Sequence, residues 1–156
     1  MTQMAGRFAA LIAGLWAGVL VCIGAIAAPA AFALLARPDA GRIVNRLFQQ
    51  DAYLSLALAL VLFVIERQRR RDATATGTGS VFSANLMLLL GTLFCTVAGY
   101  FAVQPMMEAA RAGQASLSFG TLHAISAGFF VLKSLLVLAL AWRLISANSL
   151  SRRSST

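Results

Sequence analysis

The sequence predicts an all-α integral membrane protein, a bundle of four transmembrane helices that run up, down, up and down. The first reason is composition: hydrophobic residues make up 60% of the 156-residue chain, and charged residues only 12%, about half the share usual in soluble domains. The second is that the chain contains stretches close to the ~20 apolar residues that a membrane helix needs. The third is that no stretch alternates with the period of two that marks a transmembrane strand.

The charges are sparse but unbalanced, with 13 Lys and Arg against 5 Asp and Glu and a formal net charge of +8. In so apolar a chain, basic residues flanking membrane spans are a commoner cause of such an excess than nucleic-acid binding. We therefore expect a lipid bilayer around the protein and no nucleic-acid partner. Cys22 and Cys95 both lie inside apolar runs, so they are expected to be small packing residues and not a disulfide framework.

The first stretch is uncharged over 8–36, whereas the second is uncharged only over 52–65, so its helix is expected to start before Asp51. The fourth stretch is interrupted by a single cation, Lys133. The sequence AIAAPAAFA resembles a signal-peptide cleavage site, but the apolar run exceeds the usual ~7–15 residues, so an uncleaved first helix is expected. The expected helices and domains are 8–36, 47–66, 82–104 and 118–146, within one domain at 1–146 that is followed by a cytoplasmic tail at 147–156.

The arginines predict the orientation of the bundle. Eight of them lie near the ends of the chain and in the linker after the second helix, and four lie in the loops after the first and third helices. Because cytoplasmic loops are enriched in Lys and Arg, both termini are expected in the cytoplasm, with the protein in a bacterial inner membrane. The linker RQRRRDATATGTGS is expected to be flexible, and its arginines either mark topology or bind anionic lipid.

Small residues recur at steps of four in three of the expected helices, which lets membrane helices approach closely. A compact bundle explains these stripes, and a homo-oligomer that uses the first stripe is the alternative. Pro29 is expected to kink or end the first helix, because it has no backbone N–H to donate. ARPDAGR after the first helix and AARAGQ after the third are similar, which would fit two copies of a helical hairpin. The three stripes are Ala10, Gly14, Gly18 and Cys22; Gly91, Cys95 and Gly99; and Gly120, Ala124 and Gly128.

The fourth helix carries polar residues on one face. His123, Ser126 and Lys133 fall within an arc of ~80° at 100° per residue, so they are expected to face the bundle interior. Lys133 is near the helix centre, where it either snorkels toward the cytoplasm, forms an interior hydrogen bond, or lines a path for a substrate or a proton. Asp51 lies roughly 10 Å from the middle of the expected second helix, so a salt bridge is not expected. The expected partners of Lys133 are Thr92, Thr96 and the Ala25 carbonyl.

His123 lies near the same membrane surface as Asp51, so a carboxylate could orient the imidazole. The interpretations are a structural hydrogen bond, or a haem or metal ligand. Copper ligation by Met106, Met107 and Cys95 has no recognised spacing. No catalytic constellation, P-loop or G-x-G-x-x-G occurs, so we expect no catalytic residue, no cofactor and no bound metal.

Four sequence blocks together suggest a family. They are L-W-x-G and A-P-x-x-F in the first helix, A-G-x-x-x-x-x-L-F before the second, and L-H-x-x-S in the fourth. Across about 8–145 the chain resembles the transmembrane protein 205-like family, small bacterial four-helix proteins of unknown function. That resemblance implies a multi-pass membrane protein without an established activity, and it gives Lys133 no shared role. The matching positions are Trp16, Gly18, Pro29, Phe32, Gly41, Phe48, His123 and Ser126.

The functional expectation is a non-enzymatic membrane bundle, acting as a partner, a scaffold or a small transport element. A looser resemblance to four-helix membrane proteins of haem or copper handling gives the alternative, a redox protein that uses His123. An absorbance spectrum and a metal analysis would separate the two, because only the second contains haem or copper.

The arginine distribution makes a testable prediction about topology. A cysteine introduced near Ala110 should react with a labelling reagent supplied from outside the cell, because that loop is expected on the outer side. A cysteine introduced near Ala75 should not react. The reverse pattern would contradict the predicted orientation.

Overall fold

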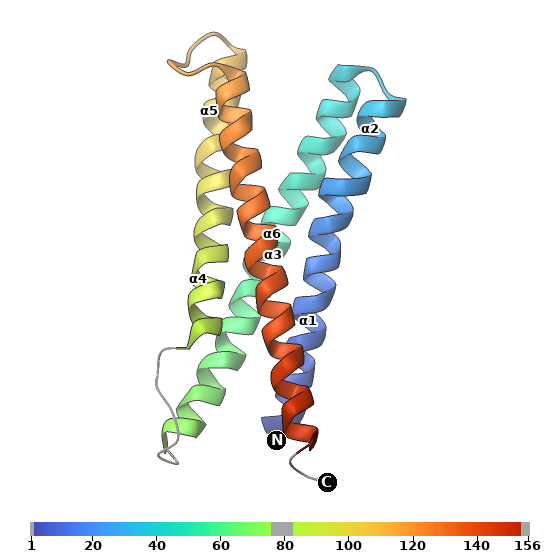
Figure 1. Cartoon of the computed structure of the whole chain (residues 1–156). Coiled ribbons are helices and arrows are strands. Elements are labelled where there is room, and N and C mark those ends of the chain that lie inside the picture. Colours follow the sequence, from blue (N-terminus) through green and yellow to red (C-terminus); the bar gives the residue numbers. More distant parts are fainter. Residues whose placement is uncertain (1, 76–82, 154–156) are drawn as a thin grey trace.

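The computed structural model describes residues 2–75 and 83–153, and every regular element in this part is helical (Figure 1). Each of four rods contains a span that is long and apolar enough to cross a membrane, so the chain is a multi-pass membrane protein. The first rod consists of α1 (Thr2–Cys22), the π-helix η1 (Ile23–Ala27) and α2 (Ala28–Leu34). The second rod is α3 (Arg37–Ala75). The third consists of α4 (Ala84–Thr96), the π-helix η2 (Val97–Ala102) and α5 (Val103–Arg111), and the fourth is α6 (Phe119–Arg153).

The helices extend beyond the expected boundaries. The helix expected to begin at residue 47 begins at Arg37, with Pro38 in its first turn, where proline is well tolerated. In the same way α6 continues to Arg153, into the segment expected as a tail. Hydropathy detects only the part of a helix that lies in lipid, and these extensions carry polar residues that form helix equally well. Because α3 begins earlier than expected, Asp51 lies nearer the middle of its span than the sequence suggested.

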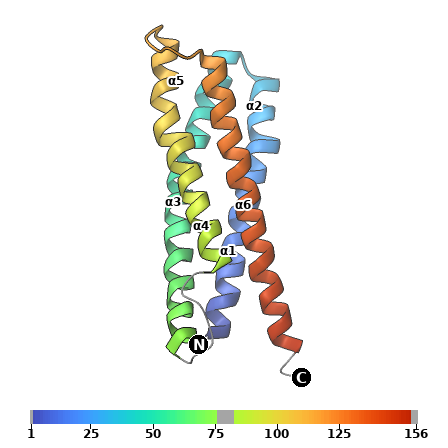
Figure 2. The same ribbon diagram turned by 60° about the vertical axis from the view of Figure 1, so that its left-hand side comes forward.

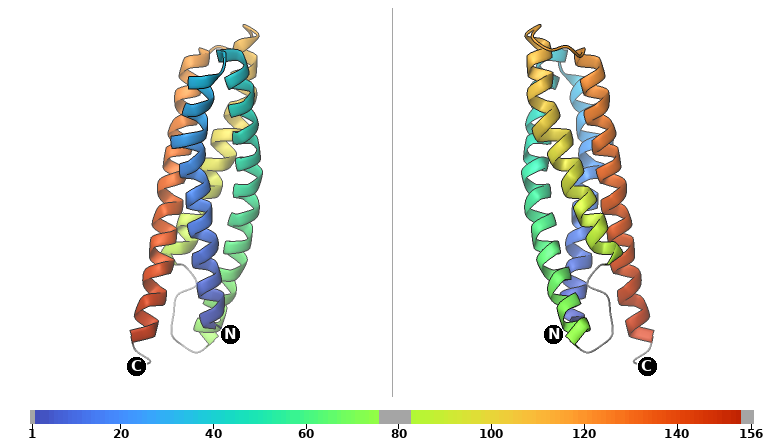
Figure 3. Two further views of the ribbon diagram at one scale, coloured as in Figure 1. Left: turned by 90° about the vertical axis from the view of Figure 1, so that its right-hand side faces the viewer. Right: turned by 90° about the vertical axis from the view of Figure 1, so that its left-hand side faces the viewer.

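The chain folds into two helical hairpins. In the first, residues 35–36 join α2 to α3, and in the second, residues 112–118 join α5 to α6. Both connections lie at one end of the bundle, here called the loop end, and both termini lie at the other, the terminal end (Figures 2 and 3).

At the terminal end the four helices pack tightly. Here α6 packs against α1 and α4, and α3 packs against α4 and α1, around an apolar core. The ends of α3 and α4 are tied by the buried Glu66, which accepts hydrogen bonds from Arg70, Ser83 and Asn85. This end of the bundle is therefore filled and closed. The largest fully buried apolar side chains of the core are Trp16, Leu20, Leu89, Val137 and Leu140.

At the loop end the two hairpins separate. Here α2 packs on α3 and α5 packs on α6, but in the described chain no α-carbon of either pair lies within 8 Å of the other pair. The bundle is therefore V-shaped in profile, with the arms of the V formed by the two hairpins (Figure 1).

Each arm contains a π-helix shortly before a proline. In the first hairpin Ala28 donates its backbone N–H to the Ile23 carbonyl, five residues back, and Pro29 follows. In the second, Val103 donates to the Ala98 carbonyl, and Pro105 follows. Because proline has no N–H, the carbonyl four residues before it loses its usual partner, and a π-turn redistributes the hydrogen bonds. Pro29 therefore does not end the helix: the first rod stays helical through it, with π-type hydrogen bonds just before the proline.

The small-residue stripes have different surroundings. A Cβ added at Gly99 would lie 2.6 Å from Cβ of Phe129 on α6, and one added at Gly24 would lie 2.9 Å from the Phe130 ring. By contrast, Gly14 has nothing within 4 Å and is exposed on α1. Glycine is thus required at position 99, where η2 approaches α6, whereas Gly24, which lies outside the three stripes, faces only the Phe130 ring. Homo-oligomerisation through the α1 stripe stays a prediction.

Gly99→Ala should destabilise the protein, because the new methyl group would overlap a Cβ that cannot rotate away. We expect a loss of about 1–3 kcal/mol in unfolding free energy, the range for overpacked cores. Gly14→Ala is the matched control and should be close to neutral. Unfolding of purified protein in mixed detergent micelles measures both variants, and equal stability of the two would contradict the close packing of η2 on α6.

Candidate functional site

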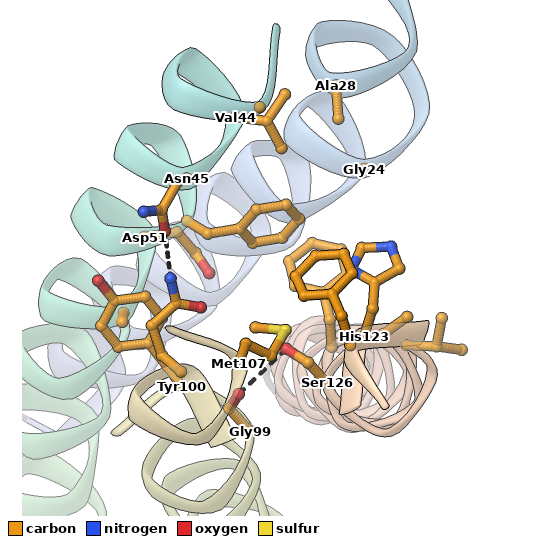
Figure 4. A pocket seen from close by; sticks show the side chains of 18 of the residues that line it. Gly24, Ala28, Val44, Asn45, Asp51, Gly99, Tyr100, Met107, His123 and Ser126 are labelled. Carbon is orange, nitrogen blue, oxygen red and sulfur yellow. Dashed lines mark hydrogen bonds between the residues drawn. The ribbon is translucent and has the colours of Figure 1, made fainter. Parts of the chain in front are cut away.

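A cavity of about 760 Å³ lies between the arms of the V. Its walls come from both hairpins, with Val44 on α3 opposite Met107 on α5 and Ser126 on α6 (Figure 4). A volume of this size lies within the range of small-molecule sites in proteins, about 300–1,000 Å³. The cavity extends from the loop end toward the middle of the bundle, where an ion pair forms its floor.

The floor is a salt bridge between Lys133 on α6 and Asp51 on α3, with Nζ 2.5 Å from Oδ2. Only 4% of Lys133 and 2% of Asp51 are exposed. The two helices lie diagonally across the bundle, and in the described residues none of their α-carbons come within 8 Å of each other. The lysine side chain therefore reaches across the bundle interior to its partner.

Two further side chains complete the network beneath the salt bridge. Ser55, one turn after Asp51, donates to Asp51 Oδ1 at 3.3 Å. The same hydroxyl oxygen accepts from Lys133 Nζ at 3.3 Å and from the fully buried Trp16 indole N–H at 3.2 Å. A hydroxyl with one proton and two lone pairs can make all three bonds. The network thus joins α1, α3 and α6 at one level.

The sequence prediction for Lys133 was wrong about its partner. Thr92 and Thr96 donate their hydroxyls to backbone carbonyls of their own helix, and the ammonium bonds to a carboxylate. The physical reason is the early start of α3: in the candidate span Arg37–Asp72, Asp51 is only a few residues from the centre. Lys133 is at the centre of its own span, Phe119–Ala147, so the two charges lie at matching depths. The salt bridge excludes snorkelling toward the terminal end in this conformation.

The expected pairing of His123 with Asp51 is also corrected, since Asp51 is engaged by Lys133 and Ser55. His123 lies at the mouth of the cavity, is exposed, and stacks on the Phe119 ring at 5.9 Å between centroids. The polar face of α6 is divided along its length, with His123 near the mouth and Lys133 at the floor.

Ser126 lies between these two positions. It is half-buried and donates its hydroxyl to the Gly99 carbonyl of η2 at 3.1 Å (Figure 4). Its partner is therefore on the third rod and not on α3. The four residues of the predicted polar cluster all line one cavity, but only Asp51 and Lys133 bond to each other.

Two pairs of side chains bridge the cavity between the salt bridge and the mouth. Phe48 on α3 meets Phe130 on α6 in an edge-to-face pair with centroids 4.9 Å apart. Gln104 on α5 donates to Asn45 on α3 at 2.7 Å (Figure 4). These side-chain contacts join α3 to α5 and α6, although no α-carbon of α3 lies within 8 Å of either helix in the part that the structure describes.

The two hairpins contribute equivalent residues. Asp51 is fourteen residues after Arg37, the start of α3, and Lys133 is fourteen residues after Phe119, the start of α6. Phe48 and Phe130 are likewise equivalent, each eleven residues into its helix. Both cross-cavity pairs therefore join matching positions of the two hairpins. The predicted similarity between the two loop sequences does not follow this register, because ARPDAGR (36–42) lies mostly within α3, whereas AARAGQ (109–114) lies at the end of α5 and before α6.

The mouth of the cavity is basic. Arg37 and Arg42 line it from the start of α3, and Arg111 lines it from the end of α5. The Arg111 guanidinium lies over the Phe119 ring, 4.6 Å from its centroid. The carboxylates at the same end, on Asp39 and Glu108, do not line the cavity.

The positions of the resembled family occupy three kinds of surroundings. Phe32, Gly41 and Phe48 line the cavity, and Trp16 supports its floor. Pro29 adjoins η1, and Gly18 is exposed on α1. Ser55 was not predicted as a site residue, although it lies one helical turn from Asp51. The π-helix before Pro105 was not predicted either, and its only local signal in the sequence is the proline itself.

A four-span membrane protein with an internal cavity is the class that this fold and site define. The chain belongs to a family described as "Domain of unknown function (DUF4149)", whose model matches residues 11–116. The matched segment includes Asp51 and the α3 wall of the cavity but ends before His123, Ser126 and Lys133. No curated protein and no solved structure matches the chain.

Substituting one partner of the ion pair should lower the unfolding free energy more than substituting both partners. Lys133→Met or Asp51→Leu alone leaves one buried charge without its partner, which typically costs about 3–5 kcal/mol. The double variant should lose much less than the sum of the two losses, because no uncompensated charge remains. Detergent unfolding of the four proteins in the cycle measures the coupling.

The matched control is the exposed pair of Asp39 and Arg42, which makes the same type of contact in solvent. Asp39→Asn should change the unfolding free energy by less than about 1 kcal/mol. Additive losses for Lys133→Met and Asp51→Leu would contradict the pairing.

Proposed function

We propose that this protein is a non-enzymatic transport element that admits a small molecule into the membrane from the loop end. The observation that supports this proposal is a cavity that opens at one end, continues to mid-bundle and stops at a buried ion pair. Below that pair the apolar core and the Glu66 cluster close the terminal end. A site open to one side and closed to the other is what one state of an alternating-access device requires.

The construction of the two hairpins also favours movement. Transporters are often built from repeats that surround a site near the bilayer midplane, with interrupted helices beside it. Here the interruptions are η1 and η2, both in cavity-lining rods, and π-turns inside α-helices are frequent at functional sites. We propose that the hairpins rock about these segments, with the salt bridge between Asp51 and Lys133 near the pivot.

The cavity is poorly equipped for catalysis. The hydroxyls of Ser126 and Thr96 are donated to backbone carbonyls, so they have no adjacent base. His123 makes no hydrogen bond to a serine or cysteine within the described chain, so the arrangement of a nucleophile beside its base is not formed there. These contacts favour binding and passage over bond cleavage.

The orientation and the finer family assignment belong to the same proposal. With both termini in the cytoplasm of a bacterial inner membrane, the cavity would open to the periplasmic side. The four sequence blocks support the assignment to the transmembrane protein 205-like family, which is part of this proposal. A second copy of the chain could pack on the exposed face of α1 around Gly14.

The alternative is a haem or copper redox protein that uses His123. The position of His123 at an exposed mouth would allow a ligand to reach its ring. Within the described residues there is no group of three or more His, Cys, Asp or Glu that could hold a metal ion. An absorbance spectrum and a metal analysis of purified protein test this alternative directly.

Occlusion of the cavity tests the transport proposal. Gly41 lines the cavity and an added Cβ there would meet no atom within 4 Å, so Gly41→Phe is expected to fill part of the space. Gly14→Phe is the matched control, because Gly14 is equally unobstructed but lies on the outer face of α1.

The probe is a dodecanol that carries a photoactivatable diazirine, added to the protein in phosphatidylcholine vesicles. In the unmodified protein it should label the α3 wall around Val44 and Phe48, besides the lipid-facing Leu11 and Leu15. Gly41→Phe should lose the labels on the α3 wall and keep those on α1, whereas Gly14→Phe should keep the labels on the wall. Equal labelling of the wall in both variants would contradict a ligand-binding cavity.

A further inference from the structure

The polar groups of the cavity are distributed unevenly along its length. In the inner part, Asn45 bonds to Gln104, Ser126 bonds to a backbone carbonyl, and the ion pair is satisfied by Ser55. Among the described residues no buried side-chain nitrogen or oxygen lacks a hydrogen-bond partner. The fully buried polar atoms of the walls are therefore already satisfied, and a ligand in this part can present apolar surface to Val44, Phe48 and Met107.

Charged groups that remain available lie at the mouth. Arg37 has no ion-pair partner in the part of the chain that the structure describes, and it is exposed. Arg111 lies on the opposite wall and touches only the face of an aromatic ring in the described contacts, which leaves its N–H donors directed elsewhere. Guanidinium groups bind carboxylate and phosphate oxygens through paired N–H donors. Both groups line the same mouth, one from α3 and one from α5, which favours an anionic ligand there.

The position of these arginines is notable for the predicted topology. They lie at the end of the bundle that the distribution of arginines assigns to the outer side, where Lys and Arg are usually few. A requirement for orientation therefore does not explain them. They also lie at helix ends, near the level at which the charged headgroups of lipids are found.

The two sides of the cavity differ in the contacts that bridge them. The Asn45–Gln104 bond and the Tyr53–Phe101 ring contact join α3 to the third rod on one side. On the other side, α2 and α6 have no α-carbons within 8 Å over the described residues.

We propose that the cavity binds an anionic amphiphile, with its phosphate or carboxylate headgroup between Arg37 and Arg111 and its apolar chain extending toward Phe48 and Phe130. This proposal rests on the proposed function, because it names the substrate class of the same cavity. The apolar chain of the ligand would extend toward the salt bridge of Asp51 and Lys133. The distance from Arg37, at the start of α3, to Asp51 is about 21 Å by helical rise.

The test compares three photoactivatable probes that share a dodecyl chain and differ in headgroup: dodecyl phosphate, dodecanol and dodecyltrimethylammonium. Each is added to the full-length protein in phosphatidylcholine vesicles. Labelling of the cavity wall around Val44 is divided by labelling of the lipid-facing Leu11 and Leu15, which corrects for the different partitioning of the probes. The ratio for dodecyl phosphate should exceed the other two by roughly tenfold or more, the gain from one charge-assisted hydrogen bond.

The double variant Arg37→Gln/Arg111→Gln should remove this preference and bring the phosphate ratio to that of dodecanol. The matched control Arg7→Gln/Arg67→Gln loses the same charge from exposed sites at the terminal end and should keep the preference. Arg37→Lys/Arg111→Lys should retain part of it, which a variant that merely misfolds would not do. Unchanged labelling of α1 in every variant shows that the bundle is intact.

The outcomes separate this proposal from the preceding one. If all three probes label the wall equally and Gly41→Phe abolishes labelling, the cavity binds amphiphiles but the selectivity for anions is wrong. A preference for dodecyltrimethylammonium also overturns the selectivity. If inorganic phosphate displaces dodecyl phosphate at equal concentration, the ligand is a free anion and the amphiphile is wrong. If no probe labels the wall, the proposed function fails as well.

Discussion

The salt bridge between Lys133 and Asp51 is the interaction on which the arrangement of the bundle depends. It joins the two diagonal helices, which otherwise meet through the ring pair of Phe48 and Phe130. Two charges so deeply buried are costly unless both are fully hydrogen-bonded. Ser55 and Trp16 supply the remaining bonds, so α1 is drawn into the same network. The charges are thereby held at the level where the arms of the V diverge, and they separate a packed half of the protein from a hollow half.

The hollow half is maintained by aromatic and amide bridges, and by glycines that let helices meet closely. Phe48 and Phe130 span the cavity above the salt bridge, and Gln104 binds Asn45 nearer the mouth. Gly99 lets η2 pack closely on α6, and Gly24 leaves room for the Phe130 ring beside η1. The cavity is thus a built feature with a polar floor, apolar walls and a basic mouth.

Much of this architecture could be predicted from sequence, and the reasons for the failures are physical. The four spans followed from hydropathy, a local property that each segment carries by itself. The burial of Lys133 followed from its position on the polar face of α6. Its partner did not, because hydropathy placed the start of the second helix ten residues too late and so put Asp51 near the membrane surface. Ser55 and Gln104 were missed because their partners lie on other helices. Such contacts can be recognised only when the packing of the helices is known.

The equivalence of Asp51 and Lys133 has a consequence for how such a bundle can be made. If a single hairpin formed this bundle as a symmetric dimer, its two copies would carry the same residue at this position. Aspartate would then face aspartate, or lysine would face lysine, and like charges would repel in the middle of the membrane. Opposite charges at this position require two hairpins of different sequence. Joining the two hairpins in one chain ensures that every bundle contains one copy of each. Covalent linkage therefore supplies an electrostatic asymmetry that identical subunits cannot have.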